Sequence, residues 1–343
     1  MKVNLILKNI FIPICISLGI VTLLEIYLKT FGGYDTSITG NTKCKIYLPE
    51  KNFSIYKPNC SLTEKHWENN KTINYQINEN GRRESNKYVS GNEKKIASVG
   101  DSFTFGAMVS IEDNYNFYGL NNLAEEKYIV HNYGVSGEGL ENIFNKINTL
   151  ELSQYEFILY GLTPNDFYEY LLETQTTKET NKIKNNKLIL NNFDNLKKLI
   201  LSTSLSRFLV HKALSNDENY YFIYLKRKPF SEYLNSKIGT NWSNAIYILE
   251  KKLANLSPEI KGKLKIYILP QRAEIVAKRL GKYNEAFINN ILEVCRREDI
   301  QCKRPNIENL AKLKESHFPF DGHLTKEGNH SIAKDLAEWS KNW

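Results

Sequence analysis

Residues 96–106 read IASVGDSFTFG, and the fold is decided by how this stretch is interpreted. A short apolar run is followed by Gly, Asp and Ser, and then by two aromatic residues around a threonine. Glycine, aspartate and serine are common turn residues, so a strand that ends in an ordinary turn is one interpretation. The other is a nucleophilic serine presented where a buried strand ends. A nucleophilic serine requires a base and further polar residues elsewhere in the chain, whereas a serine in an ordinary turn does not.

Short apolar runs alternate with amphipathic stretches on both sides of this segment. Strands joined by helical stretches of this length indicate βαβ units and a parallel sheet. The predicted strands are 94–100, 128–134, 155–161 and 263–270, with a short segment at 300–305. The predicted helices are 114–127, 140–153, 240–256 and 273–298, and a last one from about Gly328 to Trp339. The fold class expected is therefore α/β with a central parallel sheet.

The first thirty residues differ in composition from the rest. Ile10–Leu24 contains no charged residue, and with its flanks it reaches roughly 20 residues, enough to cross a bilayer. Lys2 and Lys8 precede the run and favour a cytoplasmic N-terminus. A cleaved signal peptide is the rival, but bulky residues follow the run where a small-residue cleavage site is expected. We expect an uncleaved single-pass anchor at 1–30 and an extracytoplasmic remainder, in the periplasm or at the cell surface.

Overall charge and cysteine content limit the classes of protein further. The net charge of +8, from 46 Lys and Arg against 38 Asp and Glu, is dispersed, so nucleic-acid binding is not expected. In an oxidising compartment, local pairing of Cys44 with Cys60 and of Cys295 with Cys302 is one interpretation. Four free buried thiols are the other. No His or Cys spacing is typical of a zinc site.

Two regions depart from the alternation. Residues 31–92 are polar with weak strand signals, and we expect a juxtamembrane segment that partly packs on the domain at 93–343. Residues 174–240 begin with a Thr/Lys/Asn-rich stretch and contain one amphipathic segment. They are expected to form an insertion over the sheet, as a cap or a partner surface.

Polar residues follow three predicted strands and precede the last helix. They occur in GDS, in HNYGVSGEG, in YGLTPNDF and in FPFDGHLTKEGN. In open parallel sheets, ligands bind at the carboxyl ends of the strands, so these loops are expected to meet. Hydrolysis of an ester needs a nucleophile, a base, a group that orients the base, and donors for the developing oxyanion. The candidates are, in that order, Ser102, His323, Asp321, and the oxyanion donors Ser102 N–H, Gly137 N–H and the Asn165 amide.

The order and rough spacing of these blocks resemble the SGNH (GDSL-like) hydrolases over about residues 94–343. The resemblance implies a flavodoxin-like three-layer α/β/α fold and the same roles for Ser102, Gly137, Asn165, Asp321 and His323, with no cofactor or metal. The anchor ending in LLEIYLKTFGG and the SLSRFL segment at 204–209 resemble the membrane-anchored bacterial branch of that family. The last block, Asp-Gly-His, resembles the form found in acyltransferase-like and some esterase branches.

Several of these residues also have a purely structural interpretation. Asn165 could cap a helix that starts at Asp166. Asp101, beside the serine, is expected to shape the loop. Arg272 follows a predicted strand, and it could contact the substrate or form a surface salt bridge.

Three functions follow from the sequence. The first is an anchored serine esterase that removes acyl groups, often acetyl, from a carbohydrate or other envelope substrate. The second is an O-acyltransferase that passes the acyl group to a polysaccharide hydroxyl, with a multi-pass membrane acyltransferase as a candidate partner. The third is a non-catalytic glycan-binding or scaffold protein, against which the intact set of polar blocks argues.

Overall fold

The computed structural model describes residues 2–30, 44–66, 68, 71–84, 94–125, 127–167, 202–225 and 239–343. All structural statements below concern these residues. The domain boundaries predicted at 30, 92 and 174–240 fall in or near stretches outside them and stay predictions.

The core of the chain is a five-stranded parallel sheet with the strand order β6-β5-β7-β8-β9. Its strands are β5 (Lys94–Gly100), β6 (Tyr128–Asn132), β7 (Phe157–Leu162), β8 (Leu264–Ile268) and β9 (Gln301–Lys303). In chain order this is the 2-1-3-4-5 arrangement of flavodoxin-like sheets. The order reverses between β5 and β7, so the crevice for a ligand lies beyond the carboxyl ends of these two strands. The predicted parallel α/β sheet is confirmed.

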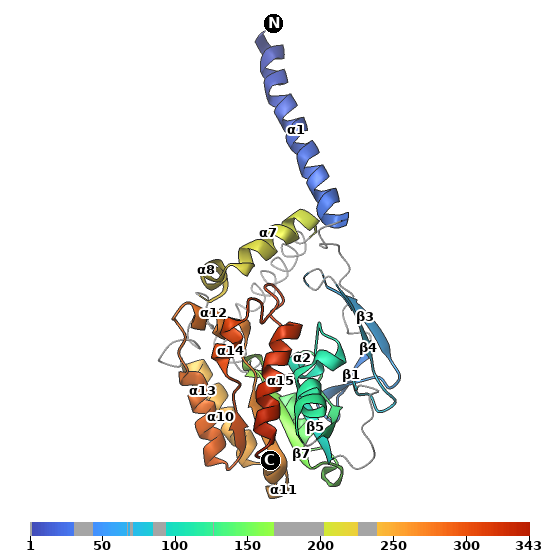
Figure 1. Cartoon of the computed structure of the whole chain (residues 1–343), viewed down its shortest axis with the longest axis vertical. Coiled ribbons are helices and arrows are strands. Elements are labelled where there is room, and N and C mark those ends of the chain that lie inside the picture. The colour runs from blue at the N-terminus through green and yellow to red at the C-terminus, as the bar shows by residue number, and fades with distance from the viewer. Residues whose placement is uncertain are drawn as a thin grey trace.

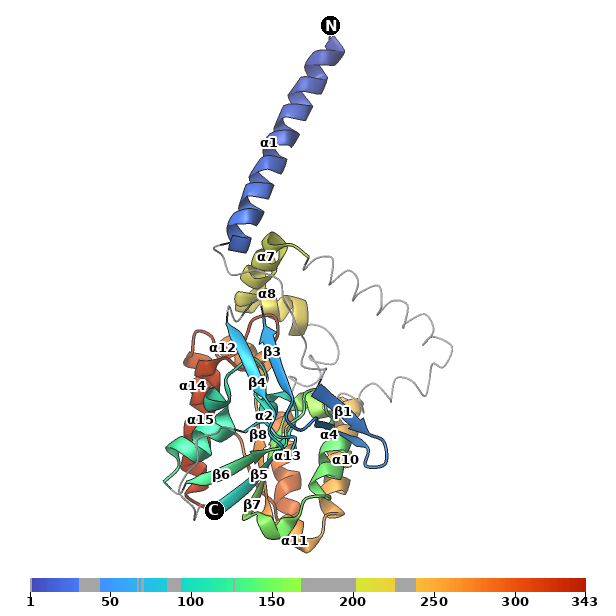
Figure 2. The same ribbon diagram turned by 90° about the vertical axis from the view of Figure 1, so that its right-hand side faces the viewer.

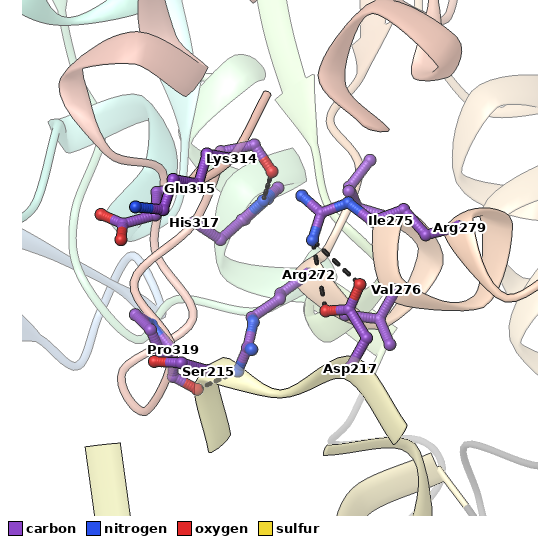
Figure 3. A pocket seen from close by; sticks show the side chains of 11 residues that line it. Ser215, Asp217, Arg272, Ile275, Val276, Arg279, Lys314, Glu315, His317 and Pro319 are labelled. Carbon is purple, nitrogen blue, oxygen red and sulfur yellow. Dashed lines mark hydrogen bonds and ion pairs between the residues drawn. The ribbon is translucent and has the colours of Figure 1, made fainter. Parts of the chain in front are cut away.

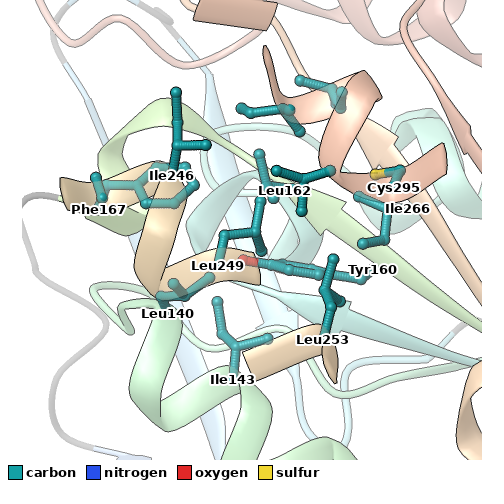
Figure 4. Packing of buried hydrophobic residues seen from close by; sticks show 14 of the residues in the cluster. Leu140, Ile143, Tyr160, Leu162, Phe167, Ile246, Leu249, Leu253, Ile266 and Cys295 are labelled. Carbon is teal, nitrogen blue, oxygen red and sulfur yellow. The ribbon is translucent and has the colours of Figure 1, made fainter. Parts of the chain in front are cut away.

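Helices cover both faces of this sheet and give the predicted three layers (Figure 1). Successive strand residues alternate between two apolar clusters: Tyr160 and Leu162 point to one, and Leu159 points to the other. Figure 4 shows the first cluster, where Leu140, Ile143, Leu249 and Leu253 lie around the Tyr160 ring. This layer contains α4 (Leu140–Ile147), α10 (Thr240–Ala254) and α13 (Ala286–Arg297). The opposite layer contains α3 (Tyr115–Phe117), the π-helix η3 (Tyr118–Leu123), α14 (Ile307–Lys312) and α15 (Lys326–Ser340).

The single helix predicted at 273–298 is wrong. Two helices occupy this stretch, α12 (Arg272–Arg279) and α13 (Ala286–Arg297). Between them Gly281 has φ +65°, a left-handed conformation that ends helices and that glycine adopts without strain. Two further short helices adjoin the sheet, α2 (Ser102–Phe105) and α11 (Pro258–Lys263).

Two antiparallel hairpins precede the sheet, and we call residues 44–66, 68 and 71–84 the hairpin segment. The first pairs β1 (Lys45–Leu48) with β2 (Phe53–Tyr56), and the second pairs β3 (Ser61–Lys65) with β4 (Thr72–Gln76). Figure 2 shows both hairpins beside the sheet. Their buried side chains form a third apolar cluster with residues of the loops at the carboxyl edge: Cys44, Tyr56, Leu62, Tyr75, Ile77, Phe105, Ala107, Met108, Val135 and Phe318. The hairpin segment thus packs directly on the edge where the site is expected.

Both predicted cysteine pairs are disulfides. Cys44 is bonded to Cys60 and closes the two hairpins into one unit, and Cys295 is bonded to Cys302 between α13 and β9. The alternative of four free thiols is therefore wrong.

Removing the first disulfide is expected to destabilise the protein. The disulfide joins residues 16 positions apart and restricts the conformations of the unfolded chain. Replacing Cys44 and Cys60 together by serine removes this restriction, and we expect a loss of about 3 kcal/mol in the free energy of unfolding. Urea unfolding measures it. The matched control is the double serine variant of Cys295 and Cys302, which are only 7 positions apart and should give a smaller loss. Equal stability of wild type and the Cys44/Cys60 variant would contradict this expectation.

A long helix, α1 (Lys2–Thr30), occupies the position of the predicted anchor and extends away from the other described elements (Figure 1). Among the described residues, we find no helix whose length and apolar character suffice to cross a membrane. The anchor predicted at 1–30 is not confirmed.

The described part of the predicted insertion is helical: α7 (Ser204–Ser215), α8 (Asp217–Tyr220) and the π-helix η6 (Tyr221–Leu225). At the base of α1, the Glu25 carboxylate accepts hydrogen bonds from the Ser204 and Leu205 N–H groups, each at 2.7 Å. Residues 174–201 and 226–238 of the predicted insertion lie outside the described residues.

Candidate active site

Ser102 is the first residue of α2, and only Asp101 separates it from the end of strand β5 at Gly100. Asp101 caps this helix, since its Oδ1 accepts a hydrogen bond from the Phe103 N–H at 2.9 Å. The turn needs glycine at position 100, where φ is +153° and a Cβ atom would lie 2.9 Å from the Gly161 carbonyl oxygen. The strand-to-helix turn therefore fixes Ser102 at the carboxyl edge of the sheet, between β5 and β7.

Ser102, His323 and Asp321 form one hydrogen-bonded chain. The Ser102 Oγ lies 2.7 Å from the His323 Nε2, although the two residues are 221 positions apart. The His323 Nδ1 is hydrogen-bonded to the Asp321 Oδ1, which also accepts the His323 N–H at 3.2 Å. Both side chains belong to residues 317–323, which we call the base loop and which precedes α15. The nucleophile–base–acid order of a serine triad is thus present.

The charges of the hydrogen-bonded residues His323 and Asp321 suit His323 to act as a general base. Burial by itself lowers the pKa of His323, but the Asp321 carboxylate and its hydrogen bond raise it above the usual 6.5. Partial burial by itself raises the pKa of Asp321, but the charge of His323 and its hydrogen bond lower it to about 2. Asp321 is therefore a carboxylate throughout the physiological range, and it stabilises the imidazolium that forms when His323 takes a proton.

Asn165 is held by hydrogen bonds from two sides. Its Nδ2 donates to the Asp101 Oδ2 at 2.8 Å, and its Oδ1 accepts from the Gln271 Nε2 at 3.2 Å. A helix-capping asparagine would instead accept a backbone N–H through its oxygen. Among the described residues, Asn165 lies inside the 3-10 helix η5 (Pro164–Phe167), and a cap for a helix at Asp166 stays a prediction. One hydrogen of the Asn165 amide is used by Asp101, and the second remains for another acceptor.

A second buried acid lies beneath this amide. The Thr163 hydroxyl is 3.1 Å from both the Asp101 Oδ2 and the Asp166 Oδ1, but a hydroxyl has only one hydrogen to donate. Burial and the nearby Asp101 charge raise the pKa of Asp166 well above its usual value. The Thr163 hydroxyl therefore lies between the two acids and donates to one of them at a time. With the hydrogen bonds that Asp101 accepts from the Phe103 N–H and the Asn165 amide, this contact shows a structural role for Asp101.

Gly137 lies in the loop that follows β6. Its φ of +75° is a left-handed conformation that favours glycine. The preceding peptide is held by the hairpin segment: the Lys45 Nζ donates to the Ser136 carbonyl at 2.8 Å, and the Ser136 N–H donates to the Tyr56 hydroxyl at 3.4 Å. The Gly137 loop is thus fixed from outside the sheet. Its predicted role as an oxyanion donor stays a prediction.

Arg272 is not a surface salt bridge. It is 7% exposed, and its guanidinium donates to the carbonyl oxygens of Pro319 and Leu214 and stacks at 3.9 Å on the Tyr220 ring. Figure 3 shows it between the base loop and α7, beside the ion pair of Arg279 with Asp217, in a small cavity of about 100 Å³. Arg272 thus ties the base loop to the inserted helices. Its predicted contact with substrate stays a prediction.

No pattern in the sequence indicates that the hairpin segment contacts the loop that follows Ser102. The Arg83 guanidinium donates to the carbonyl oxygens of Phe105 and Val109, at 2.8 and 2.6 Å, and also to that of Gly106. The Tyr75 hydroxyl accepts the Met108 N–H at 2.8 Å. Polar residues in a polar stretch look like a solvated surface until the fold brings them to their partners. In the described part of the chain, no three His, Cys, Asp or Glu side chains are placed to hold a metal ion.

Comparisons with known proteins give a likeness of fold. No family model and no curated protein matches the sequence. Among solved structures, TesA is similar with 12% identity and a TM-score of 0.42 over 73% of this chain and 99% of that one. A lipolytic G-D-S-L family protein from Veillonella parvula DSM 2008 is similar with 11% identity and a TM-score of 0.39, over 73% of this chain and 99% of that one. The acetylxylan esterase Axe2 from Geobacillus stearothermophilus is similar with 13% identity and a TM-score of 0.37, over 72% of this chain and 94% of that one. We base the functional proposal on the geometry of the site.

Proposed function

We propose that the chain is a serine esterase that cleaves acyl esters, with acetyl esters of carbohydrate or other envelope molecules as substrates. The observation that carries the proposal is the unbroken hydrogen-bonded chain from the Ser102 Oγ through His323 to Asp321. A serine in an ordinary turn does not need a base at 2.7 Å that is oriented in turn by a carboxylate.

In the proposed reaction, the Ser102 Oγ attacks the ester carbonyl carbon while its proton moves to the His323 Nε2. The tetrahedral oxyanion is stabilised by the Ser102 and Gly137 N–H groups and by the second amide hydrogen of Asn165. The C–O bond to the alcohol then breaks, and His323 returns its proton to the leaving oxygen. Water, deprotonated by His323, attacks the acyl-serine and releases the carboxylic acid and free Ser102.

The acceptor of the acyl group decides between esterase and O-acyltransferase. The test is hydrolysis of p-nitrophenyl acetate by the full chain, with and without an oligosaccharide acceptor, and with Ser102→Ala as the control. A burst of p-nitrophenol that is absent from Ser102→Ala supports the acyl-serine. Acetylated oligosaccharide among the products favours transfer. If no acyl ester is turned over in a Ser102-dependent way, the enzyme proposal fails and the non-catalytic binding function takes its place.

The proposal places the catalytic residues on the outer side of a membrane, with residues 1–30 as the attachment. Support comes from the uncharged run Ile10–Leu24 after Lys2 and Lys8. The disulfides at Cys44 and Cys295 add support, because such bonds persist in oxidising compartments. Fractionation of cells that produce the full chain, with protease added from outside, tests this location.

The pH dependence of turnover follows from the charge of His323. Only the neutral imidazole can accept the Ser102 proton, so kcat/KM is expected to rise with pH through the pKa of His323. Because Asp321 raises that pKa, the midpoint should lie above 6.5. In Asp321→Asn the carboxylate is lost, so the midpoint should move to lower pH while the activity falls. A wild-type midpoint at or below 6.5 would contradict this assignment.

A further inference from the structure

Glu68, in the connection between β3 and β4, contacts the base loop although it is 252 positions away from it in the sequence. Its Oε1 accepts the Phe320 N–H at 2.6 Å, and its Oε2 accepts the Asp321 N–H at 2.7 Å. The side chain is fully buried. A buried carboxylate that accepts two adjacent backbone N–H groups fixes both the position and the orientation of that peptide.

The base loop needs such a contact because few of its own hydrogen bonds hold Asp321. The Phe318 N–H donates to the His323 carbonyl at 2.8 Å, and the Gly322 N–H donates to the Phe318 carbonyl at 3.0 Å, which closes the loop on itself. Arg272 holds the Pro319 carbonyl from the side of α12. Glu68 holds the next two N–H groups from the hairpin segment. The loop is therefore held between a cation on one side and a carboxylate on the other.

We propose that Glu68 is a positioning residue that holds Asp321, and through it His323, within hydrogen-bond distance of Ser102. The hairpin segment is then a part of the active site and not a spacer before it. This inference rests on the proposed esterase function for its kinetic consequence. Its structural consequence, an ordered hydrogen bond between Asp321 and His323, does not depend on that function.

The charged groups around Glu68 are consistent with this role. Burial and the Asp321 charge raise its pKa to about 8, while Arg272 and the two backbone hydrogen bonds act to lower it. His66 faces it from the hairpin segment, with its Nδ1 3.9 Å from the Glu68 Oε2. A pKa of about 8 leaves the carboxyl group largely protonated at pH 7, and in that form its two oxygens still contact the two N–H groups, the hydroxyl oxygen accepting less well.

The test compares Glu68→Gln and Glu68→Ala with Glu84→Gln in the full chain. Gln keeps the size of the side chain but has one acceptor oxygen, and Ala has none. Glu84 is a half-buried carboxylate of the same segment that pairs with Arg82 and Asn78, away from the base loop. For Glu68→Gln we expect kcat for p-nitrophenyl acetate to fall by roughly 10- to 100-fold, with KM within about twofold, because small displacements of a reacting group are costly. Glu68→Ala should fall further, and Glu84→Gln should match wild type.

A second readout does not require turnover. The proton between Asp321 and His323 should give a downfield ¹H NMR signal in wild type and in Glu84→Gln, and this signal should broaden or disappear in Glu68→Gln. If wild type shows this signal but no Ser102-dependent turnover, the esterase proposal fails and the NMR comparison alone decides the role of Glu68. An unchanged signal together with an unchanged kcat in Glu68→Gln would overturn the inference.

Discussion

Replacing His323 by alanine is expected to lower kcat for an acyl ester by on the order of 10⁶-fold, the loss found when the base of a serine triad is removed. The physical reason is the 2.7 Å contact between the His323 Nε2 and the Ser102 Oγ. Without it, the hydroxyl proton has no acceptor at neutral pH and the leaving oxygen has no donor. Asp321→Asn should cost less, on the order of 10⁴-fold, because the imidazole remains but loses the carboxylate that orients it.

The kcat of the double variant Ser102→Ala/His323→Ala shows whether the two residues act together in one catalytic step or contribute independently. The two residues act in one step, so the double variant should be no slower than either single one. His330→Ala is the matched control: His330 pairs with Asp113 and stacks on Tyr118, outside the hydrogen-bonded chain of Ser102. Its kcat should stay within about twofold of wild type. If His323→Ala keeps a tenth of the wild-type kcat, His323 is not the base.

The parts of the fold that sequence reasoning predicted are those with a strong local signal. Strand β8 is buried along its whole length, and its apolar composition and the following proline identify it without any tertiary information. Gly100, which ends β5, and the serine two positions later mark the proposed nucleophile for the same reason. The pairing of Ser102 with His323 could also be predicted, because a nucleophilic serine needs a base and an Asp-Gly-His block precedes the last helix.

What the sequence could not predict depends on contacts between distant segments. Strand β3 (Ser61–Lys65) reads SLTEK and has one buried apolar residue, Leu62, so it lacks the alternation that identifies a strand. Glu68 looks like a solvated acid until the base loop lies against it. Arg272 looks like a surface cation because the helices that bury it, α7 and α8, belong to an insertion whose position no local pattern gives.

Replacing Arg83 by methionine is expected to have the largest effect on stability, a loss of about 3 to 5 kcal/mol in the free energy of unfolding. Arg83 is 2% exposed, and its guanidinium donates to three carbonyl groups of the stretch after Ser102 while it stacks at 4.4 Å on the Tyr75 ring. Methionine fills a similar volume but leaves those buried carbonyls without donors, and each orphaned group costs about 1 to 3 kcal/mol.

Urea unfolding at pH 7 measures this loss, and two further arginine variants make it specific. Arg83→Lys keeps the charge but cannot donate in a fork to several carbonyls, so its stability should lie between wild type and Arg83→Met. Arg296→Met removes an arginine whose side chain is 74% exposed and paired with Glu293 on the surface of α13, so it should cost less than about 1 kcal/mol. If Arg83→Met is no less stable than Arg296→Met, the hairpin segment does not stabilise the loop behind the nucleophile. The kcat of Arg83→Met should fall together with its stability, because the carbonyls that Arg83 holds belong to the turn that begins with Ser102.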